Sequence, residues 1–128
     1  MRLGRTALWM LLQTNAAELR FRRRIEKPGF GDYRRMLCTN DKGLLLSVPG
    51  KRVLNYVPPN GSLKYDPTAK NLVVAWDIFM QNFRMINCND VEVIAVIKTS
   101  PDPAAFWKYF YERLVDMSAS HKAKFMNT

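Results

Sequence analysis

Apolar and polar residues alternate along residues 18–40, and this alternation predicts a β-hairpin. The first arm places Leu19, Phe21 and Ile25 among the polar residues Glu18, Arg20, Arg22 and Arg24. Such two-residue periodicity is typical of a strand with one buried and one solvated face. Residues 27–32 carry proline and two glycines, which favour a turn. Residues 33–39 then form the second arm.

Residues 72–97 carry the second β pattern. We predict a strand over 72–77, a turn near 79–82, a return over 83–87 and a tight polar corner at 88–90. The last strand, 91–97, holds apolar residues at odd and even positions alike. It is therefore expected to be largely buried on both faces.

Helical periodicity marks the two ends of the chain. Residues 6–15 predict a short helix, with Thr6 as its cap and Asn15 as its end. Near the C-terminus, Asp102 can cap a helix whose first position is Pro103. Its apolar stripe, which should lie against the sheet or a partner, is Phe106, Phe110, Leu114 and Met117. A further helical turn is predicted from Ser118 to about Met126.

Residues 41–71 are rich in glycine and proline, so we predict a long irregular loop without regular elements. Tyr56 and Tyr65 are expected to pin this loop onto the rest of the domain. The resulting organisation is an N-terminal helical segment (1–16), a small β domain (17–99) and a helical tail (100–128). Residues expected in the core are Leu19, Phe21, Leu37, Leu72, Val74, Trp76, Phe83, Ile86, Val91, Val93 and Ile97.

Three short motifs carry a resemblance to a known family. A strand ending in Trp76-Asp77, a strand bearing Phe83-Arg84 and the corner Asp90-Val91-Glu92-Val93 follow one another. Together with the basic hairpin, this order resembles small SH3-like proteins encoded by bacteriophages, and also Sm-like, WYL-type regulatory domains. The resemblance covers roughly residues 17–97 without the long loop. It implies a small SH3-like or Sm-like barrel with a binding role.

The match departs from the family pattern at two points. The arginine usual at the polar corner is absent, because Asn89-Asp90-Val91 stands there. In addition, only Arg84 corresponds to a basic residue of the WYL-type ligand site. Both departures put any transfer of ligand binding in doubt.

The charge of the chain limits the classes of partner that it is expected to bind. Its 128 residues carry 20 lysines and arginines against 11 acids, a net charge of +9. Such a balance attracts nucleic acid, anionic lipid or an acidic protein face. The two cysteines, Cys38 and Cys88, are too few for a disulfide framework. They are expected to be buried thiols, with a disulfide as the alternative if their strands are neighbours.

The N-terminal segment has two interpretations. Arg2 and Arg5 precede a short apolar run, and no acid occurs before Glu18. This composition suits an organelle-targeting segment, and equally a short helix that covers one end of the domain. No apolar run approaches the roughly 20 residues that span a bilayer.

Catalysis finds little support, and we predict no enzyme and no cofactor. The single histidine, His121, lies in a tail that is expected to be exposed. The Gly29-x-Gly31 pair fits a hairpin turn rather than a phosphate-binding loop. Asp77 and Arg84 are expected to form a cross-strand ion pair. No metal site is predicted.

The basic hairpin is the main functional candidate. Arginine donates two hydrogen bonds at once to phosphate, and interleaved aromatic residues can stack bases. The candidate nucleic-acid-binding residues are Arg20, Arg22, Arg24, Tyr33, Arg34 and Arg35. An acidic protein surface and a merely solvated face remain as alternatives.

The aromatic tail is a second candidate surface. Its aromatic residues are too many for one helix face, which favours contact with a partner, either a second copy or a larger assembly. The candidate interface residues are Phe106, Trp107, Phe110, Tyr111 and Leu114.

Two functions therefore follow from the sequence. One is a phage-type accessory or regulatory protein that contacts nucleic acid or a polymerase, located in the host cytoplasm or the virion. The other is a structural component of a virion or of a mitochondrial ribosome.

Overall fold

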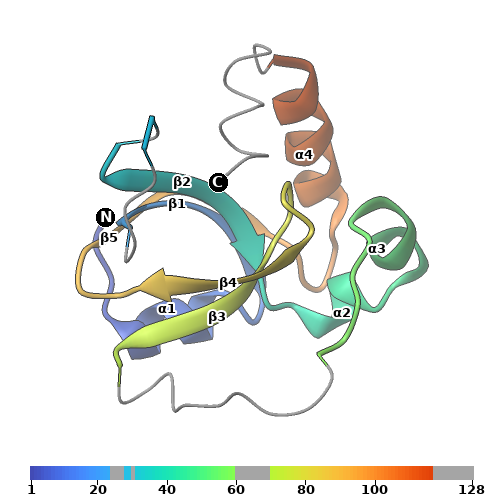
Figure 1. Cartoon of the computed structure of the whole chain (residues 1–128). Helices are drawn as coiled ribbons and strands as arrows, with labels where there is room; N and C mark the ends of the chain where they lie inside the picture. Colours follow the sequence, from blue (N-terminus) through green and yellow to red (C-terminus); the bar gives the residue numbers. More distant parts are fainter. Residues whose placement is uncertain (24–27, 30, 60–69, 117–128) are drawn as a thin grey trace.

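The computed structural model describes residues 1–23, 28–29, 31–59 and 70–116. Its centre is a five-stranded antiparallel sheet, so the chain is mainly β, as predicted. The strands are β1 (Asn15–Arg22), β2 (Tyr33–Thr39), β3 (Leu72–Asp77), β4 (Asn82–Asn87) and β5 (Val91–Lys98). They are arranged in the order β4-β3-β2-β1-β5, and the sheet is strongly curved (Figure 1).

Within the described residues, four helices flank the sheet. They are α1 (Arg5–Leu11), α2 (Lys42–Leu45), α3 (Val48–Val53) and α4 (Ala104–Asp116). Helix α1 lies under the concave side of the sheet, whereas α4 stands at the opposite side, near α2 and α3 (Figure 1). No helix in the described ranges is both long and apolar enough to cross a membrane.

The sheet has two differently covered faces, since side chains alternate along each strand. The inner, concave face packs Leu8 and Leu12 from the α1 region onto Leu19, Met36, Val73 and Ile86. The outer face packs Phe106 and Phe110 of α4, together with Leu45 and Leu54, onto Leu37 and Trp76. The sheet thus supports two cores, one on each side.

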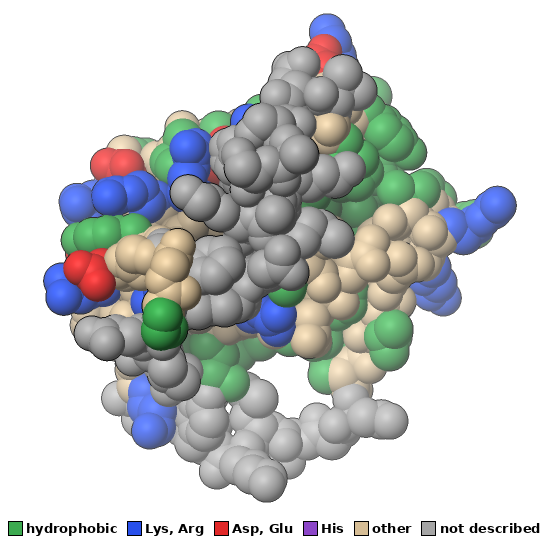
Figure 2. Space-filling view, turned by 45° about the horizontal axis from the view of Figure 1, so that its top comes forward, with side chains coloured by type: hydrophobic (Ala, Val, Ile, Leu, Met, Phe, Trp, Pro, Cys, Tyr) green, Lys and Arg blue, Asp and Glu red, His purple; other side chains and the backbone are tan. Residues whose placement is uncertain are grey.

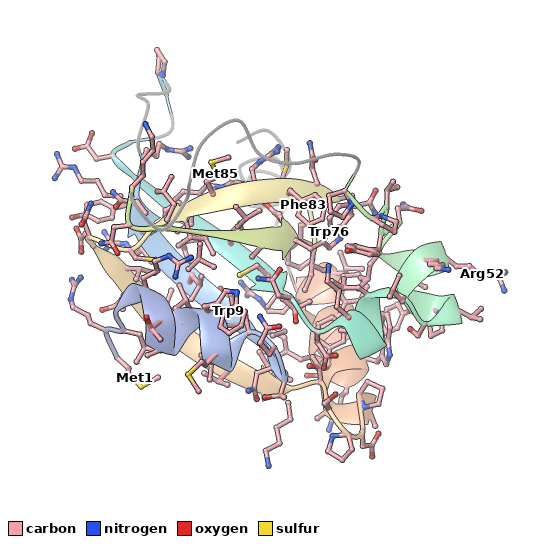
Figure 3. The ribbon with its side chains drawn as sticks, turned by 90° about the horizontal axis from the view of Figure 1, so that it is seen from below. Met1, Trp9, Arg52, Trp76, Phe83 and Met85 are labelled. Atoms are coloured by element: carbon pink, nitrogen blue, oxygen red, sulfur yellow. The ribbon has the colours of Figure 1, made fainter. Side chains whose placement is uncertain are left out.

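The predicted core is largely found. Val74, Phe83 and Ile97 are half-buried, whereas the other predicted core residues are buried. Trp76 lies edge-on to Tyr56 and Phe83, each at a centroid distance of 5.0 Å. Figure 3 shows Trp76 and Phe83 side by side, where the sheet meets the helices.

The prediction that β5 is buried on both faces was wrong. Ile94 and Val96 are each 41% exposed. The pairing of β5 with β1 shifts between Glu18 and Leu19, which leaves Ile94 as a bulged residue. β5 is also an edge strand of the sheet. Apolar side chains on one face of this edge strand therefore reach solvent.

The N-terminal helix is shorter than predicted. It begins after Gly4, so Thr6 lies inside the helix instead of capping it. Asn15 starts β1, and its side-chain amide donates a hydrogen bond to the Leu11 carbonyl at 2.9 Å. At the other end, Asp102 Oδ1 accepts from the Ala104 N–H at 3.0 Å, which is the predicted cap of α4.

The prediction of an irregular segment over residues 41–71 was wrong for its first part. Asp41 and Ser47 each accept a hydrogen bond from a backbone N–H three residues on, and so cap α2 and α3. Pro49 lies in the first turn of α3, where its missing N–H is not needed. The buried Tyr56 does pin this segment. Tyr65 and the turn predicted from Ser118 to Met126 lie outside the described residues.

Gly50 stands where α3 passes α2. A Cβ atom at this position would lie 2.1 Å from the Leu44 carbonyl oxygen and 2.7 Å from that of Leu45. Glycine is therefore required by the close approach of two backbones.

Candidate functional site

The exposed arginines of the hairpin lie on the outer face of the sheet. In register, Arg20 on β1 is opposite Arg35 on β2, and Arg22 is opposite Tyr33. Arg20, Arg22 and Arg35 are exposed, whereas Tyr33 is half-buried. We call these four residues the outer arginine face. Lys and Arg side chains gather with a few acids over the strand ends at the left of Figure 2.

Tyr33 is held in place from two sides. The guanidinium carbon of Arg20 lies 4.0 Å from the centre of the Tyr33 ring, a cation–π contact. The Tyr33 hydroxyl donates to Asp90 Oδ2 at 2.9 Å. Arg20 thus covers one face of the Tyr33 ring. A nucleic-acid base cannot stack directly on that face, although it could stack on the guanidinium plane of Arg20.

Asp90 also binds Arg2, which sequence reasoning did not assign to this face. Arg2 Nη1 donates to Asp90 Oδ1, and this contact lowers the pKa of Asp90 and raises that of Arg2. Arg2 is exposed and Asp90 only half-buried, so the pair adds little stability. The bridge between Arg2 and Glu92 places the N-terminus here, a long-range contact that periodicity does not reveal.

Arg35 lies at the border between the hairpin and α4. Its Nη2 donates to Glu18 Oε1 at 2.9 Å, and Arg113 Nη2 donates to the same oxygen at 2.9 Å. Tyr109 donates its hydroxyl to Glu18 Oε2 at 2.7 Å. Burial and the bond to Glu18 raise the pKa of Tyr109 to about 12. Two guanidiniums thus share one carboxylate, which leaves a net positive charge.

Glu18 itself corrects the pattern on which the hairpin was predicted. Alternation placed it on the solvated face, yet it is only 5% exposed because α4 covers it. Three donors compensate for its burial, as a buried charge requires. The sequence signal for this cluster would have been the pair Tyr109 and Arg113, four residues apart on one side of α4.

Arg34 does not belong to the outer arginine face. It is opposite Phe21 on the inner face, 8% exposed, and its Nη2 donates to Asp77 Oδ2 at 2.5 Å. A buried, paired arginine is not available to a ligand on the outer face. Asp77 therefore has Arg34 as its ion-pair partner, in place of the predicted Arg84. Arg24 lies outside the described residues.

The aromatic residues of α4 are divided between core and surface. Phe106 and Phe110 are buried against the sheet within the chain itself, so they are not free for a partner. Trp107 and Leu114 are half-buried, and Tyr111 is 51% exposed. Figure 2 shows hydrophobic side chains along this helix. The candidate interface is reduced to Tyr111 and the exposed parts of its neighbours.

Both cysteines are buried and unbonded, as expected. Burial raises the pKa of the Cys38 and Cys88 thiols, which keeps them protonated and poor as nucleophiles. Within the described ranges, no three His, Cys, Asp or Glu side chains come together in a way that could hold a metal ion. His121 lies outside these ranges.

Comparison of the chain with protein-family models, with curated proteins and with solved structures finds no significant match.

Proposed function

We propose that this protein is a non-enzymatic binding protein that contacts the phosphates of a nucleic acid through its outer arginine face. The observation that carries this proposal is the pair Arg20 and Arg22. They are exposed and two residues apart on one strand. The ion pairs in the described part of the chain involve other arginines, namely Arg2, Arg34, Arg35 and Arg113. The net charge of +9 supports the same kind of partner.

The rigid support of these side chains favours recognition. β1 lies between β2 and β5, so Arg20 and Arg22 start from a strand that is paired on both sides. Arg20 is further oriented by the Tyr33 ring. Side chains with few accessible conformations lose less entropy on binding a phosphate.

The proposal includes the finer fold, a small SH3-like or Sm-like barrel of the phage type. Support comes from the strong curvature of the sheet and from the pairing of its first and last strands, β1 and β5. A phage accessory or regulatory protein would suit this combination of a small curved sheet and a basic face.

The test compares two double variants that remove the same charge. R20Q/R22Q changes the outer arginine face, and K51Q/R52Q changes exposed residues of α3. Figure 3 shows Arg52 projecting into solvent at the far end of the molecule. Fluorescence anisotropy with labelled single-stranded and double-stranded DNA and RNA measures affinity against salt.

Wild-type protein is expected to bind with affinity that falls steeply with salt. R20Q/R22Q should flatten the logarithmic salt slope by roughly 1.4–1.8, about 0.7–0.9 for each lost phosphate contact. K51Q/R52Q should keep the wild-type slope. Absence of binding tighter than about millimolar near physiological salt, below ordinary nonspecific affinity, would refute the proposal, as would equal losses in both variants.

A structural role in a larger assembly is the second candidate, and one observation favours it. Tyr111 is 51% exposed on α4, next to the half-buried Trp107 at a ring distance of 6.2 Å. Exposed aromatic side chains are common at protein interfaces. Sedimentation of wild-type protein and of Y111S would reveal self-association through this helix.

A further inference from the structure

The turn between α2 and α3 presents apolar side chains to solvent. Leu46 caps the end of α2 and is 47% exposed, and Val48 begins α3 and is 68% exposed. Val57, which follows α3, is 65% exposed. Val48 and Val57 have the two largest exposed fractions of the large hydrophobic side chains in the described ranges. We call Leu46, Val48, Lys51, Arg52 and Val57 the α2–α3 tip.

The backbone of the α2–α3 tip is fixed. Ser47 Oγ accepts from the Gly50 N–H at 3.1 Å, and the Gly50 carbonyl accepts from the Tyr56 N–H at 3.4 Å. The second bond holds the segment that bears Val57 beside α3. The side chains that already fill the outer core from this corner are Leu44, Leu45 and Leu54. The apolar side chains of the tip therefore stay in solvent unless a partner covers them.

Two cations stand beside these apolar side chains. Lys51 and Arg52 follow Val48 by three and four residues on α3, so all three lie on the same side of the helix. Both cations are exposed, and Figure 3 shows Arg52 projecting away from the sheet. Nearby, Lys42 Nζ donates to the Tyr56 hydroxyl at 2.7 Å, which is an uncharged acceptor. The tip thus combines apolar and positively charged side chains.

The sequence around the tip contains no acid. Residues 42–65 include four lysines and arginines and no aspartate or glutamate. Asp41, which precedes this stretch, is buried and caps α2. On the side of α3, at the right of Figure 2, Lys and Arg side chains project from the molecule with hydrophobic side chains nearby. A local charge of one sign favours a negatively charged partner.

The apolar side chains distinguish between the classes of anionic partner. Nucleic-acid phosphates can pair with the cations of the tip, but its aliphatic side chains offer no ring on which a base could stack. The surface of an anionic bilayer accepts both kinds of group. Aliphatic side chains enter the boundary of the acyl region, while lysine and arginine keep their charges among the headgroups.

We propose that the α2–α3 tip binds the surface of an anionic lipid bilayer. Its three aliphatic side chains enter the interface, and its two cations contact the headgroups. Burial of apolar area and attraction to the negative surface act together in such binding. The outer arginine face lies on β1 and β2 and shares no residue with the tip, so this proposal does not depend on the proposed function.

The first test measures sedimentation with sucrose-loaded vesicles. Vesicles of phosphatidylcholine with phosphatidylserine are compared with vesicles of phosphatidylcholine alone. Wild-type protein should sediment with the anionic vesicles, and its partition coefficient should fall as salt is raised. K51Q/R52Q should lower the partition coefficient about 25-fold, roughly fivefold for each charge. V48S/V57S should lower it about tenfold, because aliphatic area is no longer buried in the interface.

Two matched variants remove the same kinds of group from other surfaces. R20Q/R22Q loses the same charge from the outer arginine face, and I94S/V96S loses two exposed aliphatic side chains from β5. Each should keep the partition coefficient within about threefold of the wild type, because these groups do not enter the interface. Circular dichroism checks that the four variants are folded.

The second measurement needs no variant. Wild-type protein labelled with nitrogen-15 is mixed with anionic bicelles that contain a spin-labelled lipid. The amide signals of residues 46–48 and of Val57 should broaden more than those of β1. This readout keeps the proposal testable if a variant of the tip does not fold. Broadening that is strongest over β1 would mean that another face meets the bilayer, and would overturn the proposal.

The vesicle experiment can overturn the proposal in two ways. One is a failure of the wild type to sediment with anionic vesicles. The other is a loss in K51Q/R52Q with none in V48S/V57S, which would mean that the tip takes a purely charged partner, such as an acidic protein surface. The two proposals can fail separately, since R20Q/R22Q tests nucleic-acid binding and V48S/V57S tests lipid binding.

Discussion

Arg34 and Arg35 are adjacent in the sequence and have opposite environments. Arg34 lies on the inner face of the sheet, nearly excluded from water and paired with Asp77. The side chain of Arg35 is 45% exposed on the outer face, where it shares Glu18 with Arg113. The comparison shows that a run of basic residues in a strand is not one surface. The pleat sends alternate members to different faces, with different energetic roles.

The largest effect is expected from breaking the inner ion pair. Arg34→Met leaves the buried Asp77 carboxylate without its cation, which should lower the free energy of unfolding by about 3–5 kcal/mol. Arg35→Met should lower it by no more than about 1 kcal/mol, since Arg35 is partly solvated and Arg113 remains on Glu18. Urea denaturation of both variants measures the difference.

A double variant provides the control for this comparison. Adding Asp77→Asn to Arg34→Met removes the unpaired charge, so part of the lost stability should return. Similar losses for Arg34→Met and Arg35→Met would mean that the two faces do not differ as described.

An intermediate effect is expected at the outer face, where Glu18 joins the sheet to α4. Glu18→Ala removes the acceptor for Tyr109, Arg113 and Arg35, and should cost roughly 1–3 kcal/mol. The loss of stability should be local. Relative to the wild type, Glu18→Ala should accelerate amide hydrogen exchange more in α4 than in β2. Uniform acceleration over the sheet would instead show that Glu18 stabilises the inner core as well.

The smallest effect concerns pH. The pKa of Tyr109 is raised to about 12 from an ordinary value of 10.0, so folding favours its protonated form. The stability that protonated Tyr109 contributes to the fold is fully present below about pH 10 and is lost as the pH rises toward 12. The free energy of unfolding is measured against pH for the wild type and for Tyr109→Phe, and the difference between the two should show this decline. A difference that is flat between pH 10 and 12 would contradict the assigned contact with Glu18.

The sequence predicted much of the fold because its strands alternate clearly. The two hairpins, the last strand and the capped C-terminal helix are all found. Helix α3 escaped prediction because Pro49 and Gly50 are poor helix formers in general, while here Pro49 suits a first turn and Gly50 a close contact.

The site was less predictable than the fold. Alternation correctly placed Arg20 and Arg22 on one face, but it left open whether Arg34 or Arg35 lies opposite them. It also says nothing about what covers that face. Glu18 is buried by α4, which is remote in sequence, and Arg34 is paired with Asp77 across 43 positions. Contacts of this kind depend on the curvature of the sheet and the docking of helices, which local patterns do not encode.

The contact at Gly50 has a consequence for natural variation. The position has no left-handed backbone angle, so its constraint comes entirely from the Leu44 and Leu45 carbonyls that any side chain would meet. Among relatives with the same corner between α2 and α3, glycine should be invariant here, even where Gly29 and Gly31 drift to other turn residues. Insertions should accumulate in the hairpin turn and not between residues 41 and 54, because lengthening that corner would pull Leu45 and Leu54 out of the outer core.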